Sequence, residues 1–298
     1  MRSVSPAGPG APPPGGGGRG IRCSDLCAGY LGHRVLDGVT FTVTEPAIYV
    51  VLGPNGAGKT TLFRTLAGIL VPDRGTVEID GEPVDQQSAR DRMHFLSTID
   101  GMPDGLNVEE SLRFYARVQG AVDDDVERVL RLLEITELRN RQFSMLSTGQ
   151  KKRVSIARIF LKPRDIYLLD EPTANLDPKV ASEIRDLVLA LSRDRIVLYS
   201  SHNLYEARDI GRYVLALKEG RLAYFGDIRA MKTTKYIVGI RPAAPSEALA
   251  NRPRKGEYFL FELSGPDRVP ALIQELGAKG VQIREVKEMG NPLEELFA

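Results

Sequence analysis

Residues 53–60 read GPNGAGKT, which matches the phosphate-binding pattern G-x-x-x-x-G-K-[ST] at every fixed position. Glycines in such a loop allow the backbone to wrap closely around an anion, so that successive amide N–H groups point inward. The apolar run PAIYVVL at residues 46–52 precedes the loop, and apolar residues at helical spacing follow it over residues 59–70. A strand, a glycine loop and a helix in this order predict the first βα unit of a parallel-sheet domain that binds a nucleoside triphosphate.

The loop residues have distinct expected roles. Lys59 is expected to reach the β- and γ-phosphates, and the hydroxyl of Thr60 is expected to ligate Mg²⁺. The helix that begins near Lys59 adds the positive end of its dipole. A glycine-rich turn that carries a lysine by coincidence would explain neither the strand before the loop nor the amphipathic helix after it. The predicted nucleotide-binding residues of this segment are Gly53, Pro54, Asn55, Gly56, Ala57, Gly58, Lys59, Thr60 and Thr61.

Two adjacent carboxylates end a second apolar segment, IYLLDE at residues 166–171. A strand that is buried on both faces delivers the acids at its carboxyl end to the same sheet edge as the phosphate loop. Asp170 is predicted to hold Mg²⁺, mostly through its water shell. Glu171 is predicted to be the general base that polarises the attacking water. Acids at a strand end also occur as helix caps, so the pair indicates a catalytic site only in combination with the phosphate loop.

The segment LSTGQKKR at residues 146–153 lies between the loop and the acids. From the residues alone, an anion site at a helix N-terminus and a plain helix cap are equal alternatives. With this segment the chain resembles the ATP-binding cassette (ABC) ATPase family, whose signature is LSGGQ followed by a basic residue. In that family the signature contacts the γ-phosphate bound by the other subunit. The resemblance implies that role for Ser147, Thr148, Gly149 and Gln150, of which Thr148 replaces the usual first glycine.

The resemblance extends over residues 21–228 and implies roles for three more side chains. Tyr30 stands where an aromatic ring stacks on adenine, although a lone tyrosine at a strand end is as often part of the core or the surface. Asp177, in ANLD, matches the loop that communicates across the family dimer. His202, in SSHNLYEA, matches the switch histidine that contacts the γ-phosphate, which makes it a candidate catalytic residue.

One position departs from the family pattern. The family places Gln, or Glu in some exporters, at the end of the strand before its helical insert, and in MHFLSTID this position is Thr98. Because threonine is shorter, its hydroxyl is expected to reach Mg²⁺ or the attacking water only through a bridging water. A slow rate of hydrolysis by the isolated cassette is the expected consequence.

The order of motifs and composition predicts three regions. Residues 1–20 are rich in proline and glycine and lack the apolar core of a signal peptide, which predicts a disordered tail on a cytoplasmic protein. Residues 21–230 are expected to form an α/β P-loop NTPase domain of the ABC cassette type, with a mixed sheet and a helical insert at about residues 100–150. Residues 231–298 show a β-β-α-β rhythm and are expected to form a small accessory α/β domain.

The bulk composition limits the partners. A formal net charge of +1 over 298 residues leaves no basic excess to meet the phosphates of nucleic acid. No apolar run approaches the ~18 residues that span a bilayer. Cys23 and Cys27 are expected to be reduced thiols, since a metal site would need further ligands and a disulfide would suit a secreted protein better.

Three functions are open to a P-loop ATPase with this signature: a transporter subunit, a translation-associated ATPase, and a chromosome- or repair-associated ATPase. Translation-type members carry two cassettes in one chain, and repair-type members divide the cassette with long coiled coils. This chain shows one cassette, and its insert lacks sustained heptads. The resemblance therefore implies the ATPase subunit of an ABC transporter.

The resemblance also implies partners. It implies a head-to-tail dimer with a second cassette, identical or different, and two ATP molecules between the subunits. It implies integral membrane permease subunits on other chains, which would hold the protein at the inner face of the cell membrane. The ending PLEELF resembles the C-terminal segment of cassettes from drug, lipid and polysaccharide exporters, and this favours export over uptake.

Overall fold

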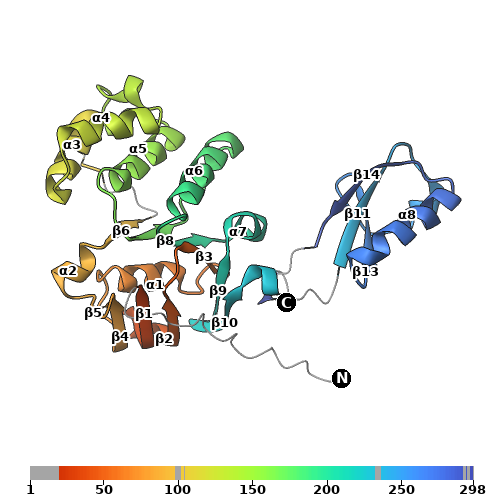
Figure 1. The fold of residues 1–298 in the computed structure, drawn as a ribbon, viewed down its shortest axis with the longest axis horizontal. Coiled ribbons are helices and arrows are strands. Elements are labelled where there is room, and N and C mark those ends of the chain that lie inside the picture. Colours follow the sequence, from red (N-terminus) through yellow and green to blue (C-terminus); the bar gives the residue numbers. More distant parts are fainter. Residues whose placement is uncertain are drawn as a thin grey trace. The chain divides into compact units, whose positions relative to one another are not determined.

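The computed structural model describes residues 20–97, 102–103, 105–231, 236–290, 293 and 296–297. The chain divides after Arg229 into two compact units, which are described here separately (Figure 1). The strands of the first unit are β1 (Ile21–Tyr30), β2 (His33–Val43), β3 (Ala47–Leu52), β4 (Arg74–Ile79), β5 (Glu82–Pro83), β6 (Met93–Leu96), β7 (Ile166–Asp170), β8 (Ile196–Ser201), β9 (Tyr213–Lys218) and β10 (Arg221–Asp227). Its helices are α1 (Lys59–Leu66), α2 (Gln87–Arg90), α3 (Val108–Gln119), α4 (Asp123–Leu132), α5 (Thr148–Phe160), α6 (Pro178–Leu191) and α7 (Leu204–Ile210), with 3₁₀ turns η1 (Thr136–Leu138), η2 (Phe143–Met145) and η3 (Ile228–Ala230).

Two sheets form the base of the first unit. One is antiparallel with the order β2-β1-β4-β5, and the other has the order β10-β9-β3-β8-β7-β6. In the larger sheet β9, β3, β8, β7 and β6 run parallel, while β10 is antiparallel to β9. The prediction of an α/β fold with a mixed sheet is confirmed.

Helix α1 packs between the sheets. It contacts β1 and β2 of the antiparallel sheet and β7 of the larger one, and its Leu62, Phe63 and Leu66 belong to a core drawn from both sheets. Every residue of β3 and β7 is buried. Parallel strands that are covered on both faces are apolar along their whole length, which is why these two strands are readable in the sequence.

Helix α1 is shorter than the apolar spacing over residues 59–70 predicts, because it ends at Leu66. Gly68 adopts a left-handed conformation with φ of 69°. A left-handed residue just beyond the last turn ends a helix, and the apolar residues after it belong to the following loop.

Three helices form a separate helical region above the sheet edge in Figure 1, where α3, α4 and α5 contact one another. A capping box fixes the start of α3: the N–H of Glu110 donates to Asn107 Oδ1, and the N–H of Asn107 donates to Glu110 Oε2, both at 2.9 Å. Leu112, Val129 and Ile156 are among the buried residues of these helices. This region lies between β6 and β7 in the chain.

The register of the larger sheet fixes the position of the site. Leu52 of β3 pairs with Ser201 of β8, and Asp170 of β7 pairs with Ser200. The carboxyl ends of these parallel strands therefore meet at one edge, where ligands bind in open α/β sheets. The segments that follow β3, β7 and β8 therefore all start at this edge of the sheet.

The second unit is an antiparallel sheet with one long helix. It contains β11 (Tyr236–Pro242), β12 (Arg254–Lys255), β13 (Tyr258–Leu263), β14 (Ile283–Glu288), α8 (Val269–Ala278), and 3₁₀ turns η4 (Glu247–Leu249) and η5 (Pro266–Arg268). The strand order is β12-β13-β11-β14. Leu272 and Leu276 of α8 pack with Val238, Ile240 and Phe261 of the sheet in a core of its own.

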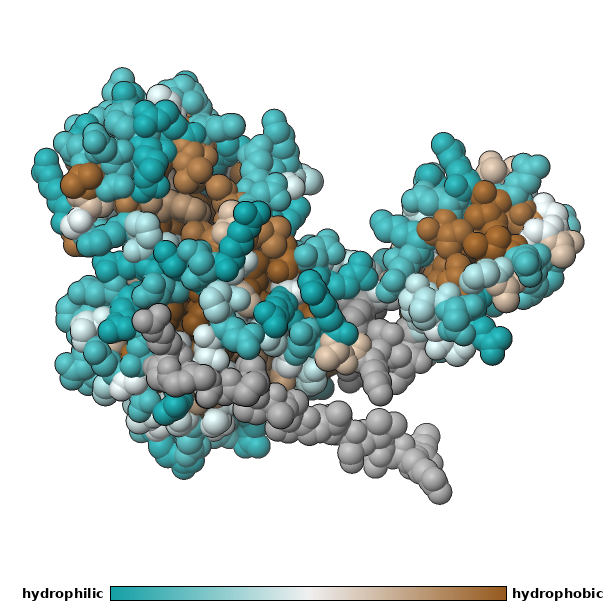
Figure 2. Space-filling model, viewed as in Figure 1, coloured by the Kyte–Doolittle hydropathy of each residue, from teal (hydrophilic) through white to brown (hydrophobic). Residues whose placement is uncertain are grey.

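The visible surface of the first unit in Figure 2 is mainly hydrophilic, and hydrophobic residues show mainly where the helical region adjoins the sheets. Within the described ranges, none of the helices has the length and apolar composition that crossing a bilayer requires. Cys23 and Cys27 are buried free thiols, and burial raises the pKa of Cys23 to about 12.

His94 is a buried histidine on β6, with 7% of its surface exposed. Its Nε2 lies 2.6 Å from the carbonyl oxygen of Lys162. A carbonyl only accepts, so Nε2 carries the proton in the neutral ring. The ring also lies against Tyr167, with centroids 5.4 Å apart. Burial lowers the pKa of His94 to about 4, against the hydrogen bond to Lys162, which raises it.

This pKa predicts a pH-dependent stability. The folded-state pKa of His94 lies below the ordinary value of 6.5. The stability that the neutral ring contributes to the folded state is therefore complete above pH 6.5 and is lost as the pH falls toward 4. We expect the free energy of unfolding to decrease by up to about 3 kcal/mol over this window because of this residue. Urea unfolding between pH 7 and pH 4 measures it. His94→Gln keeps a donor and should flatten the profile, whereas His33→Gln, at an exposed histidine, should not. An unchanged profile in His94→Gln would contradict the assignment.

Candidate functional site

The phosphate loop connects β3 to α1 and requires glycine at three positions. Gly56 and Gly58 have φ of 81° and 102°, which is the left-handed region that favours glycine. A Cβ at Gly53 would lie 2.7 Å from the carbonyl oxygen of Leu217 and 2.8 Å from the Cβ of Ala57. The spacing of the motif thus follows from the backbone path between the strand and the helix.

Lys59 is buried at the start of α1, with 6% of its surface exposed. Its Nζ donates to the carbonyl oxygens of Gly53 and Pro54, at 2.8 and 3.3 Å. Burial lowers the pKa of Lys59, while the charges of Glu171 and Asp170 act to raise it. The ammonium group is therefore held at the phosphate loop, within electrostatic reach of both acids.

Asp170 ends β7 and is fully buried. The hydroxyl of Ser200 donates to its Oδ1 at 2.6 Å, while its Oδ2 is buried without a hydrogen-bond partner among the described residues. An unpartnered buried acceptor costs about 1–3 kcal/mol, and more when it is charged. A free carboxylate oxygen beside a lysine and a phosphate loop is the type of ligand that Mg²⁺ prefers, so the residues present fit this ion.

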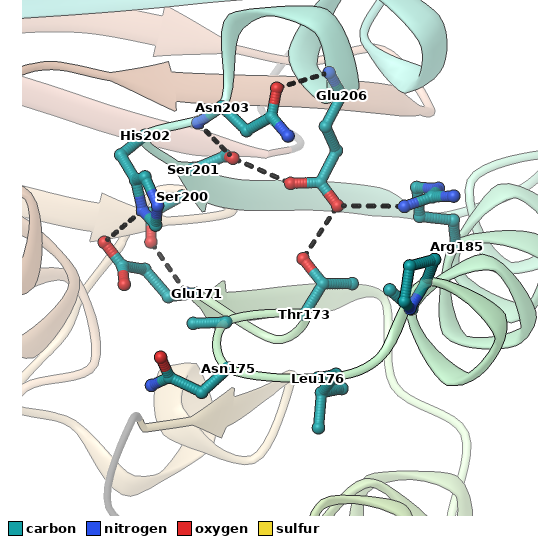
Figure 3. Close-up of a pocket in the computed structure, with 13 residues that line it drawn as sticks. Glu171, Thr173, Asn175, Leu176, Arg185, Ser200, Ser201, His202, Asn203 and Glu206 are labelled. Atoms are coloured by element: carbon teal, nitrogen blue, oxygen red, sulfur yellow. Dashed lines mark hydrogen bonds and ion pairs between the residues drawn. The ribbon is translucent and has the colours of Figure 1, made fainter. Parts of the chain in front are cut away.

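Glu171 lies in a strained turn directly after Asp170. Its φ of 47° is in the left-handed region, which costs a residue with a Cβ about 1–2 kcal/mol. Its N–H donates to the hydroxyl of Ser200 at 2.8 Å, which holds the turn. Its Oε1 lies 3.5 Å from Nδ1 of His202, and Figure 3 shows the two side chains pointing toward each other. The turn thus directs the carboxylate of Glu171 toward His202.

A cavity of about 330 Å³ lies beside this pair. Glu171, Ser200 and His202 line one side of it, and the loop residues Ala174 and Leu176 line the other. Glu171 and His202 are the candidate catalytic residues predicted from the sequence, and their side chains come together at the sheet edge. Asp170 and Lys59 lie beside them, as the electrostatic contacts of Lys59 indicate.

The signature segment lies elsewhere. Ser147 caps α5 in a capping box with Gln150: the N–H of Gln150 donates to Ser147 Oγ at 3.3 Å, and the N–H of Ser147 donates to Gln150 Oε1 at 3.1 Å. Ser147, Thr148, Gly149 and Gln150 line a second cavity, of about 620 Å³, that does not include Glu171 or His202.

Asp177 lines the same second cavity. It caps α6, where its Oδ1 accepts from the N–H groups of Lys179 and Val180, both at 3.1 Å. Asn175 and Leu176, just before it, line both cavities. The loop between Glu171 and Asp177 is therefore the wall between the signature and the acid site.

Tyr30 ends β1 at the hairpin turn to β2, with 39% of its surface exposed. Its hydroxyl accepts a hydrogen bond from Nη1 of Arg64 on α1, at 3.2 Å. This contact places the hydroxyl of Tyr30 beside α1, the helix that follows the phosphate loop. Thr98 lies outside the described residues.

Four polar residues that hold the site were not predicted from the sequence. Ser200 joins Asp170 to Glu171, and Thr173 and Tyr199 bond to the buried carboxylate of Glu206. The available signal is the pair of serines that ends the otherwise apolar strand IVLYSS. In the structure both serines are buried. Buried polar groups need partners, so such a strand end indicates a hydrogen-bond network.

Comparisons with known proteins identify similar chains. The profile of the family described as ABC transporter matches residues 36–174. The chain is 35% identical over 224 residues to the energy-coupling factor transporter ATP-binding protein EcfA of Methanoculleus marisnigri, which covers 72% of this chain and 81% of that protein. It is 33% identical over 214 residues to the cytochrome c biogenesis ATP-binding export protein CcmA of Roseobacter denitrificans, which covers 72% and 94%. A solved dimeric ATP-binding cassette in a post-hydrolysis state with ADP and Pi shares the fold, with a TM-score of 0.65 at 23% identity over 70% of this chain and 99% of that one.

Ser200 offers a direct test of the geometry of the acids. Ser200→Ala leaves Asp170 Oδ1 and the N–H of Glu171 without their partner, so we expect a loss of about 1–3 kcal/mol in the free energy of unfolding. Urea unfolding measures it. Ser192→Ala is the matched control, because its hydroxyl donates only to the carbonyl of Leu189 at an exposed helix end; it should change stability by less than ~0.5 kcal/mol. Equal stabilities of the two variants would contradict the bridging role.

Proposed function

The chain belongs to the ABC transporter ATP-binding family, and on this basis we propose that it powers an exporter through the acid pair at the end of β7. As a member of this family it is an ATP-binding and ATP-hydrolysing subunit of a transporter. The proposal adds the roles of individual residues and the direction of transport. The observation that carries the site assignment is the meeting of Lys59, Asp170, Glu171 and His202 at one sheet edge.

The proposed chemistry assigns one task to each group. The phosphate loop and Lys59 bind the phosphates of ATP, and Tyr30 stacks on adenine. Thr60 and the free oxygen of Asp170 would hold Mg²⁺, which when bound neutralises charge on the phosphate oxygens. Glu171 takes a proton from the water whose oxygen attacks the γ-phosphorus, and ADP leaves with the bridging oxygen.

His202 completes the proposed site. Its Nδ1 lies beside the carboxylate of Glu171, where an N–H donor from the imidazole can orient that carboxylate or contact a γ-phosphate oxygen. The ring is largely exposed to the cavity side, with 61% of its side chain accessible. It is therefore placed to respond to whether a γ-phosphate is present.

The two separate cavities support a dimer of cassettes. Within one chain, Ser147 to Gln150 line a cavity that excludes Glu171 and His202, so they are proposed to act on ATP bound by a second cassette. The solved cassette of the same fold is dimeric. In a head-to-tail pair, Asp177 would lie between the two nucleotide sites and carry contacts across the interface.

The direction of transport is the finer part of the proposal. The names of similar proteins include both an energy-coupling factor transporter and an export protein. The folded second unit after Arg229, together with the resemblance of its last residues to exporter cassettes, favours export.

Glu171→Gln tests the assignment of the base. It keeps the size of the side chain while removing the proton acceptor, so ATP binding should be unchanged and hydrolysis should fall by ~10²-fold or more. The variant should also retain an ATP-bound dimer, measurable by size-exclusion chromatography. Glu78→Gln, which removes only an exposed pairing with Arg22 on the antiparallel sheet, should hydrolyse ATP normally. Near wild-type hydrolysis by Glu171→Gln would show that the base lies elsewhere.

Isolation from native membranes tests the transporter assignment. The ATP-trapped Glu171→Gln chain should recover an integral membrane protein with several spans. Reconstituted with it in vesicles, the wild-type chain should move cargo away from the compartment that holds ATP. Cargo movement toward that compartment would make the protein an importer. Failure to recover any integral membrane protein would contradict the proposed permease partner.

A further inference from the structure

Glu206 is a buried carboxylate on α7 that the proposed chemistry does not use, with 8% of its surface exposed. Its Oε1 accepts from the hydroxyls of Thr173 and Tyr199, at 2.7 and 2.9 Å. Its Oε2 accepts from the hydroxyl of Ser201 at 2.7 Å, and Nη1 of Arg185 lies 3.6 Å from Oε1. Figure 3 shows Thr173, Ser201 and Arg185 directed toward the carboxylate of Glu206.

The partners of Glu206 come from separate parts of the site. Thr173 lies in the loop between Glu171 and Asp177. Ser201 ends β8 and directly precedes His202. Arg185 belongs to α6, the helix that Asp177 caps. One carboxylate therefore joins the loop that reaches the signature cavity to the strand that presents the histidine.

The backbone around His202 is fixed on both sides by the same network. The hydroxyl of Ser201 accepts from the N–H of Asn203 at 3.0 Å while it donates to Glu206. The Oδ1 of Asn203 in turn accepts from the N–H groups of Tyr205 and Glu206, at 3.0 and 3.2 Å. His202 lies between these two anchored residues, so its position depends on where Glu206 is held.

We propose that Glu206 is a positioning residue that couples His202 to the loop from Thr173 to Asp177, and hence to the second cassette. The inference rests on the roles proposed above for His202 and Asp177. Hydrogen bonds to a charged acceptor are stronger than those between neutral groups, so this carboxylate ties the histidine strand to the loop. A displacement of His202 on meeting a γ-phosphate is carried to Asp177 through this carboxylate.

The chemistry requires a carboxylate. Three hydroxyls donate to its two oxygens, and glutamine would replace one oxygen by an NH₂ group that only donates. Glu206→Gln therefore sets a donor against a hydroxyl donor without changing volume. A hydroxyl that faces this NH₂ group must reverse to accept from it, and all three hydroxyls lose their charged acceptor. The coupling is therefore weakened, while Asn203 still caps α7.

Steady-state hydrolysis and ATP affinity measure the coupling. We expect Glu206→Gln to lower kcat by ~10-fold or more while the Kd for ATP stays within about twofold, because the phosphate loop is untouched. Thr173→Val should lower kcat in the same way, and Thr173→Ser, which keeps the hydroxyl, should restore it. In the double variant Glu206→Gln/His202→Ala, kcat should fall no further than in His202→Ala alone, since both changes remove one function.

Glu45→Gln is the matched control. Glu45 also accepts from a tyrosine hydroxyl, that of Tyr213 at 3.0 Å, and pairs with Arg212 at 3.4 Å, but it lies before the amino end of β3. It should leave kcat unchanged.

The rates of these variants decide the proposal. Wild-type kcat in Glu206→Gln, or multiplicative losses in the double variant, would overturn it. If Glu206→Gln does not fold, the comparison of Thr173→Val with Thr173→Ser decides, and equal rates in that pair would overturn it. If His202→Ala loses activity and Glu206→Gln keeps it, the coupling is refuted while the role proposed for His202 stands. Wild-type activity in His202→Ala refutes the role proposed for the histidine and the coupling with it.

Discussion

The hydroxyl of Ser200 connects the two strands on which the site depends. It donates to Asp170 at the end of β7 and accepts from the N–H of Glu171 one residue later. The first bond stabilises a charge that is fully buried, and the second holds a turn that costs a non-glycine residue energy. A hydroxyl suits this position because it donates and accepts at once. This one group therefore holds both Asp170 and Glu171, the residues proposed above as metal ligand and general base.

The buried charge of Lys59 is tolerated at the sheet edge because the charges of Glu171 and Asp170 have the opposite sign. Lys59 is buried, which disfavours its charged form, yet the charges of Glu171 and Asp170 favour it. The same edge leaves one oxygen of Asp170 unpartnered among the described residues. A site with this imbalance gains stability from a ligand that brings both a cation and negative phosphate oxygens. Binding of Mg²⁺ with ATP would satisfy both requirements together.

The sequence predicted the parts of this site that depend on local chemistry. GPNGAGKT and IYLLDE are readable because a strand buried on both faces is continuously apolar and ends where polar residues begin. The roles of Tyr30, Asp177, His202 and the signature came from the family resemblance. Ser200 and Glu206 were missed because their partners are set by the placement of β8 between β3 and β7, which spacing along the chain does not reveal. The length of α1 was overestimated because the apolar spacing continues past Gly68, whereas the helical conformation of the backbone ends before it.

The end of β8 shows how one strand serves two networks. Successive side chains of a strand point to opposite faces, so Tyr199 and Ser201 share one side and Ser200 takes the other. The contacts follow this alternation: Tyr199 and Ser201 bond to Glu206, and Ser200 bonds to Asp170. The chain then continues directly to His202. A shift of β8 by one residue would exchange the two faces and disconnect both networks, so the register that pairs Ser200 with Asp170 also fixes the histidine beside Glu171.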